Sequence, residues 1–131
     1  GELGKSAKEL KKLMNLCKIH KKSKFVDIKL RDKFVSSAQR YLSSGMDISD
    51  GLFSDLAKLS DSSKIGYKFL KNIQKEIGCS GEEYEMLVSF SPRQRKAVMR
   101  RASQSRTPLN IFAIGKRVKY INRCKSHHFK R

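Results

Sequence analysis

Apolar residues at helical spacing predict a first helix near the amino terminus of the chain. They recur every three or four positions, at Leu10, Leu13, Met14 and Cys17. Ser6-Ala7-Lys8-Glu9 precedes most of them and has the S-x-x-E form of a capping box, in which both polar side chains bind free N–H groups of the first turn. We therefore expect a helix over about residues 7–19, with its apolar stripe facing the core.

The same spacing predicts two more helices in the first half of the chain. Apolar positions between Phe34 and Leu42 indicate a helix that ends near Gly45. Ser49 or Asp50 can cap the next helix, which continues to the polar run at residues 60–63. Its expected buried face consists of Leu52, Phe53, Leu56 and Leu59.

Alternating apolar and polar residues predict strands in the second half. Residues 65–70 alternate weakly, whereas residues 84–90 form a clearer strand that ends at Ser91. Ser91 as a cap, with Pro92 at the first helical position, indicates a fourth helix that runs to about residue 103. We expect a final strand over residues 109–114, ended by Gly115, and a short strand just before Asp47.

This order of elements favours a single domain of the α/β (α+β) class over residues 1–131. Amphipathic helices and half-apolar strands bury their apolar sides by packing in layers. We expect a three-layer α/β/α sandwich in which the helices cover a mixed sheet.

The composition adds a strong positive charge, since 30 Lys and Arg stand against 12 Asp and Glu and give a net charge of +18. Such a charge attracts the phosphates of nucleotides, nucleic acids or lipids without choosing among them. No apolar segment approaches the roughly 18 residues of a membrane span, and the amino terminus lacks a signal-peptide layout. We expect a soluble, cytoplasmic protein.

The cysteines do not indicate a disulfide framework. Cys17, Cys79 and Cys124 are an odd number at wide spacing with no C-x-x-C pair, which fits a reducing compartment, so we expect no bridge. Cys124 with His127 and His128 lacks a nearby partner pair, so we expect no zinc site either.

Acidic residues gather at two places in this basic chain. Asp47, Ser49, Asp50 and Gly51 lead into a predicted helix, where carboxylates and backbone N–H groups meet, and Glu82, Glu83 and Glu85 precede the clearer strand. Carboxylate oxygens are the ligands that magnesium prefers, and it takes one or two of them together with phosphate oxygens. From the residues alone, a simple helix cap at Asp50 with a solvated Asp47 remains the alternative.

Two segments resemble the signatures of thiamine-monophosphate kinases. Met-Asp-Ile-Ser-Asp-Gly-Leu-Phe-Ser-Asp-Leu at 46–56, the first motif, is similar to one signature. Ser-Gly-Glu-Glu-Tyr-Glu-Met-Leu at 80–87, the second motif, is similar to the other, usually written G-G-E-D-Y-E-L-L. Residues 1–7 look like the glycine-rich entry into the carboxy-terminal domain of these enzymes, and residues 114–116 look like their late strand and turn. The resemblance covers nearly all of the chain and implies the fold of the aminoimidazole-ribotide synthetase superfamily.

The resemblance implies transfer of the γ-phosphoryl group of ATP to thiamine monophosphate, which gives thiamine diphosphate with the help of Mg²⁺. It implies that Asp47 and Asp50 bind magnesium, Ser49 contacts the nucleotide and Glu82 contacts the thiamine phosphate. It assigns supporting positions to Gly51, Gly81 and Glu83, and it assigns no individual residue as catalytic. Tyr84 and Glu85 are interpreted as structural.

The chain also departs from the family pattern. Ser80 replaces a glycine, Glu83 replaces an aspartate, the stretch from 66 to 80 is short, and Ser126 stands where an aromatic residue usually precedes the late His-Phe pair. The resemblance implies an amino-terminal half with most of the magnesium ligands and the dimer interface, which we do not expect within these 131 residues. We therefore expect homodimers only in a full-length protein, no membrane or nucleic-acid partner, and no kinase activity from the 131 residues alone.

Two other functions stay open. One is a nucleic-acid-binding module that uses the cationic residues of the fourth helix, Arg93, Arg95, Lys96, Arg100 and Arg101. The other is a non-catalytic remnant that acts as a scaffold.

Overall fold

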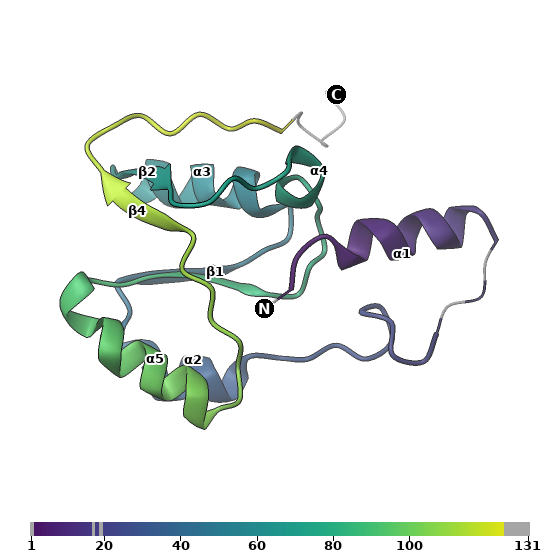
Figure 1. Ribbon diagram of the computed structural model, residues 1–131, viewed down its shortest axis with the longest axis horizontal. Coiled ribbons are helices and arrows are strands. Elements are labelled where there is room, and N and C mark those ends of the chain that lie inside the picture. Colours follow the sequence, from purple (N-terminus) through teal and green to yellow (C-terminus); the bar gives the residue numbers. More distant parts are fainter. Residues whose placement is uncertain (1, 17, 19, 125–131) are drawn as a thin grey trace.

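The computed structural model describes residues 2–16, 18 and 20–124 (Figure 1). Its helices are α1 (Lys5–Met14), α2 (Asp32–Ala38), α3 (Leu52–Ser63), α4 (Lys75–Gly78) and α5 (Arg95–Gln104), with 3-10 turns at η1 (Gln39–Tyr41) and η2 (Pro92–Gln94). Its strands are β1 (Ser44–Asp47), β2 (Gly66–Phe69), β3 (Met86–Ser89) and β4 (Ala113–Lys116). The described part of the chain thus mixes helices with short strands, as an α+β protein does.

The strands form two separate antiparallel pairs instead of the mixed sheet that the sequence predicts. β1 pairs with β3, with Ser44 opposite Ser89 and Asp47 opposite Met86. β2 pairs with β4, with Gly66 opposite Lys116. The prediction of one mixed sheet is wrong for the described residues, because each strand is only four residues long and finds a single partner.

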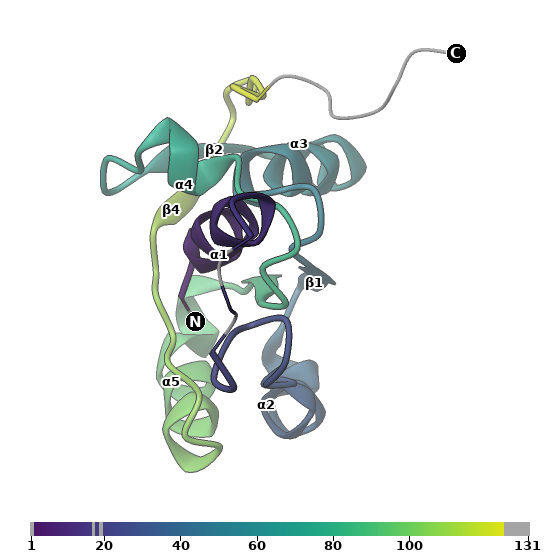
Figure 2. The ribbon, with the colours of Figure 1, turned by 90° about the vertical axis from the view of Figure 1, so that its right-hand side faces the viewer.

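Helices lie on both sides of the β1–β3 pair, as Figures 1 and 2 show. One apolar cluster joins α3 to this pair and is formed by Ile48, Leu52, Phe53, Leu56, Leu59 and Leu87. A second cluster joins α2 to α5 through Phe34, Ala38, Val98 and Ala102, and Val88 of β3 packs against it. Adjacent residues of β3 therefore point into different clusters, as the two-residue period of a strand requires.

Most predicted elements are present, with shifted ends. The strand at 84–90 is β3, the weak strand at 65–70 is β2, and the short strand before Asp47 is β1. Ser91 caps η2 by accepting a hydrogen bond from the N–H of Arg93, with Pro92 at its first position, as predicted. The final strand lies about four residues later than expected, so that Gly115 is inside β4 and does not end it. The short helix α4 was not predicted.

The predictions of a capping box and of a buried apolar stripe in α1 are wrong. The helix begins at Lys5 after Gly4, and the Ser6 hydroxyl donates to the carbonyl of Glu82 at 2.7 Å instead of capping the helix. Leu10, Leu13 and Met14 are all exposed. The amino-terminal arm, which we define as the described residues of 2–31, is instead held by polar contacts that are described below.

A disulfide joins Cys79 to Cys124, with 5.6 Å between their Cα atoms, so the prediction of no bridge is wrong. The two cysteines are 45 residues apart in the sequence, and only the folded chain brings them together. The segment before Cys124 also lies along α3, because the Tyr120 hydroxyl donates to the carbonyl of Phe53 at 3.2 Å. Burial raises the pKa of Tyr120 to about 12.

Within the part of the chain that the structure describes, none of the helices has both the length and the apolar character that a membrane crossing requires. His127 and His128, considered above for zinc, lie outside the described residues, as does Ser126.

Candidate functional site

The two motifs lie side by side, although 23 residues separate them in the sequence. Beyond the β1–β3 pair, the N–H of Ile48 donates to the carbonyl of Glu85 at 2.8 Å. The N–H of Glu82 donates to the carbonyl of Ser49 at 2.8 Å, and the N–H of Glu83 donates to that of Ile48 at 3.3 Å. The loop that carries Asp47, Ser49 and Asp50 is therefore fixed against the loop that carries Glu82.

Glycines make this close approach possible. A Cβ added to Gly81 would lie 2.7 Å from the carbonyl oxygen of Ser49, and one added to Gly51 would lie 2.9 Å from the carbonyl carbon of Cys79. Gly51 also has a φ of 98°, in the region that side chains disfavour. The close packing of the backbone therefore requires glycine at both positions. The supporting role predicted for Gly51 and Gly81 in a site stays a prediction. The backbone of Cys79 fills the space beside Gly51.

Asp55, in the first turn of α3, organises the loop of the first motif. Its side chain is fully buried, and its Oδ2 accepts hydrogen bonds from the N–H groups of Ser49 at 2.9 Å and Asp50 at 3.0 Å. The prediction that Ser49 or Asp50 caps α3 is wrong, since Gly51 is the cap residue and no side chain caps the helix there. Sequence reasoning missed Asp55, although an acidic residue in the first turn of a helix was the available signal.

The side chains proposed for magnesium differ in their surroundings. Asp47 is exposed, whereas the Asp50 side chain is one-third exposed and accepts a hydrogen bond from the Lys58 ammonium group at 2.6 Å. Lys58 also donates to Asp55 at 2.8 Å, and these two hydrogen bonds, the one to Asp50 first, raise the pKa of Lys58. In the described ranges, no three His, Cys, Asp or Glu side chains come together as a group that could hold a metal ion.

Two carboxylates of the second motif are buried and structural. Glu83 is fully buried and accepts hydrogen bonds from the Ser80 hydroxyl, from the N–H of Gly4 at 2.8 Å and from the Lys24 ammonium group at 2.8 Å. Ser80 thus supplies a hydrogen-bond donor to the buried Glu83. These contacts are structural, and the supporting role of Glu83 in a site stays a prediction.

Glu85 binds Arg31 in a bidentate ion pair with N–O distances of 2.9 and 2.8 Å. Burial by itself would raise the pKa of Glu85, but the hydrogen bonds from Arg31 and from the N–H of Glu2 together lower it. Glu83 and Glu85 therefore anchor the amino-terminal arm to the second motif, while most of the arm's described apolar residues stay exposed and Leu3 packs against the core.

The second motif has an unusual backbone. Glu82 and Tyr84 both have a φ of 53°, in the left-handed region that non-glycine residues rarely adopt. Their side chains are exposed, whereas those of the residues between and after them, Glu83 and Glu85, are buried. Non-glycine residues in this region persist where the surrounding contacts hold them, and they concentrate at functional sites.

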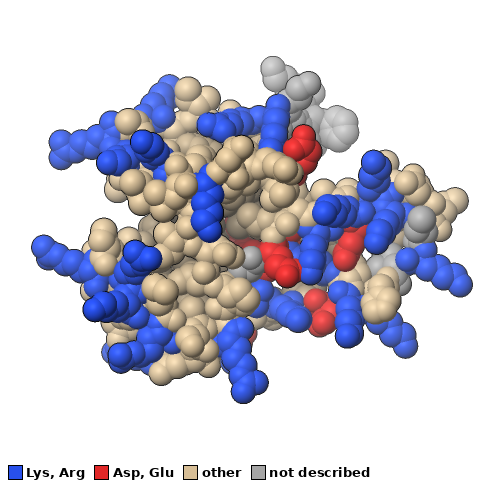
Figure 3. Space-filling model, in the orientation of Figure 1, with Lys and Arg blue, Asp and Glu red and all other residues tan. Residues whose placement is uncertain are grey.

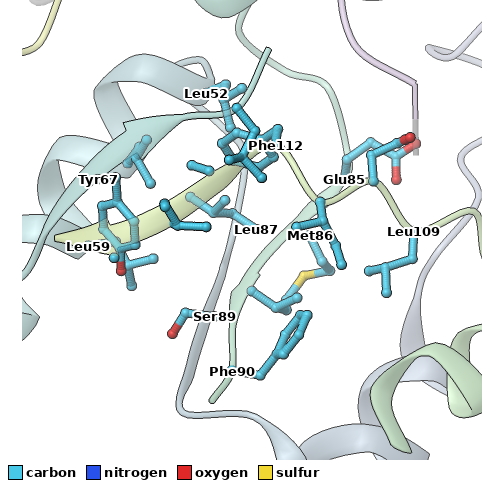
Figure 4. Close-up of a pocket in the computed structure, with 18 of the residues that line it drawn as sticks. Leu52, Leu59, Tyr67, Glu85, Met86, Leu87, Ser89, Phe90, Leu109 and Phe112 are labelled. Atoms are coloured by element: carbon cyan, nitrogen blue, oxygen red, sulfur yellow. The ribbon is translucent and has the colours of Figure 1, made fainter. Parts of the chain in front are cut away.

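An apolar cavity of about 590 Å³ lies next to the second motif. Figure 4 shows Leu52 and Leu59 of α3, Met86 and Leu87 of β3, and Leu109 and Phe112 around it. Two charged residues, Glu85 and Arg95, border it, and Glu85 is engaged by Arg31, while most of the other lining residues are apolar.

The surface potential favours anions. On the face in Figure 3, most acidic side chains gather where α1 joins the body, and Lys and Arg side chains surround them. The net charge of +18 attracts phosphate compounds to the chain from a distance, whereas the motifs themselves lie where the acidic side chains gather.

No protein-family model matches the chain. One curated protein to which it is similar is a thiamine-monophosphate kinase of Nitrosopumilus maritimus (strain SCM1), at 31% identity over 62% of this chain and 30% of that protein. The chain thus spans about a third of the length of the relative that it matches. The similarity is partial and indicates a kinase-related origin.

Proposed function

We propose that this chain forms the carboxy-terminal part of a thiamine-monophosphate kinase, which transfers the γ-phosphoryl group of ATP to thiamine monophosphate. The observation that carries the proposal is the hydrogen-bonded contact between the two motifs, since Glu82 and Glu83 donate to the carbonyls of Ser49 and Ile48. Segments that resemble two separate signatures of one family lie together, and the related kinase supports the same family. The resemblance implies a three-layer α/β/α sandwich, of which the β1–β3 pair would be part.

In this function, Asp47 and Asp50 hold magnesium and Ser49 contacts the nucleotide. The residues fit the ion in part. Asp50 already binds a cation, the Lys58 ammonium group, and Asp47, three residues earlier at the end of β1, is exposed. Magnesium commonly takes only one or two protein carboxylates and fills its shell with phosphate and water oxygens. Bound there, it would neutralise the charge that develops on the transferred phosphoryl group.

Glu82 is proposed to contact the thiamine phosphate. Its backbone is fixed by Ser49 and by Ser6, which donates to its carbonyl, while its side chain stays exposed. A carboxylate held next to the magnesium loop is suited to orient a substrate whose thiazolium ring is cationic.

Binding of magnesium and ATP tests the proposal. We expect chemical-shift changes at residues 47–51 and 81–83 when the labelled chain is titrated with a non-hydrolysable ATP analogue and Mg²⁺, and a weaker response in Asp47→Asn. Asp61→Asn, which removes the same charge from an exposed position, should bind like the wild type. Equal binding by both variants would contradict the proposal. We also expect no turnover of ATP with thiamine monophosphate by the 131 residues alone, and measured turnover would overturn that part.

A nucleic-acid-binding module is a second candidate, favoured by the surface of α5. The helix contains no acidic residue, and Arg95, Lys96 and Arg100 are exposed on it. Among the described residues, none of these three forms an ion pair. If they bind the phosphate backbone, affinity for a single-stranded oligonucleotide falls steeply with salt and survives Asp47→Asn, whereas changing the three residues to Gln flattens the salt dependence.

A further inference from the structure

Lys58 and Asp55 form a bridge that reaches the loop of the first motif from α3. Asp55 is fully buried, and its two oxygens are occupied by the N–H groups of Ser49 and Asp50 and by Lys58. Because Asp55 is buried and both of its oxygens already accept hydrogen bonds, its contacts fix where the loop lies.

Lys58 differs from Asp55 because it can move. Its side chain is 51% exposed, and its ammonium group lies 2.8 Å from Asp55 and 2.6 Å from Asp50. A long, half-exposed lysine can change rotamer at little cost, and its contact with the buried Asp55 does not depend on Asp50. Of the three charged groups, Asp50 and Lys58 are the two that can exchange partners.

We propose that Lys58 is an internal counter-ion of Asp50, which a divalent cation must displace in order to bind the first motif. Lys58 is then a positioning residue that holds the Asp50 carboxylate in place when no metal is bound and competes with the metal for it. Asp55 keeps the ammonium group nearby and the loop in place after the exchange. This inference rests on the proposed magnesium-binding role of Asp50.

Removal of the competitor should strengthen metal binding, an effect that general damage to the fold does not produce. A half-exposed ion pair of this kind contributes about 0.2–1 kcal/mol. We therefore expect Lys58→Met to bind Mn²⁺ about 1.4- to 5-fold more tightly than the wild type. Lys58→Arg, which keeps the charge, should bind like the wild type. Lys71→Met removes one positive charge from an exposed loop position and therefore controls for the change in net charge.

The experiment is a Mn²⁺ titration of the full 131-residue chain, followed by the relaxation of water protons, with Asp50→Asn as a variant that should lose binding. Hydrogen exchange at the amides of Ser49 and Asp50 reports whether the loop is intact, and both should stay protected in Lys58→Met. If this variant binds Mn²⁺ no more tightly than Lys71→Met while both amides remain protected, the inference fails and the proposed function stands. If neither the wild type nor Lys58→Met binds Mn²⁺ at millimolar concentration, both fail.

Discussion

Replacing Lys24 by Met tests whether buried charge holds the amino-terminal arm on the second motif. The Lys24 ammonium group donates to the carboxylate of Glu83 at 2.8 Å and to its backbone carbonyl at 2.9 Å. The Glu83 side chain is fully buried, whereas that of Lys24 is 17% exposed. Lys24→Met keeps the length of the aliphatic stem but leaves the carboxylate without its positive partner.

The expected loss in the free energy of unfolding is large for a protein of this size. Removing one partner of a buried ion pair typically destabilises the fold by about 3–5 kcal/mol. Glu83 keeps its hydrogen bonds from Ser80 and Gly4, so we expect the lower end of that range, about 3 kcal/mol. With a denaturant slope of about 1–3 kcal/mol per M for urea, the unfolding midpoint should fall by about 1–3 M.

Urea unfolding followed by circular dichroism measures the change. Lys21→Met is the matched control, because Lys21 is an exposed lysine of the same arm, and it should change the free energy of unfolding by less than about 0.5 kcal/mol. In the double variant Lys24→Met/Glu83→Gln, the loss should be smaller than the sum of the single losses, since no charge is left buried. A loss of under 1 kcal/mol for Lys24→Met, or strict additivity in the double variant, would refute the reasoning.

Three further predictions concern the packing around the motifs. Gly81→Ala forces a methyl group against the carbonyl of Ser49 and should lower stability by about 1–3 kcal/mol in thermal unfolding; unchanged stability would mean that the motifs are less tightly apposed. The pKa of Glu85 is lowered on folding, so its ion pair stabilises the protein above the ordinary value of 4.5 and is lost as the pH falls through the lowered value. Urea midpoints measured between pH 2.5 and 6 should show this acid dependence, and Arg31→Met should reduce it. Reducing the disulfide opens a link across 45 residues and should cost about 4 kcal/mol, so that a reductant leaving the midpoint unchanged would contradict that estimate.

Much of the local structure could be predicted from the sequence, because its signals act over a few residues. The alternation of residues 84–90 predicts β3, and Ser91 with Pro92 predicts the start of η2 and α5. The ends of elements were less accurate, as the shift of β4 shows, because they depend on which partner strand is available.

The candidate site could be predicted as two acidic motifs but not as an arrangement. Asp55 was missed because its role depends on burial and on the N–H groups of a loop that folds back over it. Glu83 and Glu85 are part of the same acidic cluster as Glu82, yet their partners come from the arm, more than 50 residues away.

The sequence by itself determined the positive charge of the chain, the position of most helices and strands, and the two motifs that indicate its function. Only the tertiary structure decided which acidic side chains are buried and paired, which cysteines form a disulfide, and that the stripe of α1 stays exposed. The physical reason is the range of the interactions. Caps and periodic patterns act within one or two turns of chain, whereas burial and ion pairing depend on segments that meet only after the chain has folded.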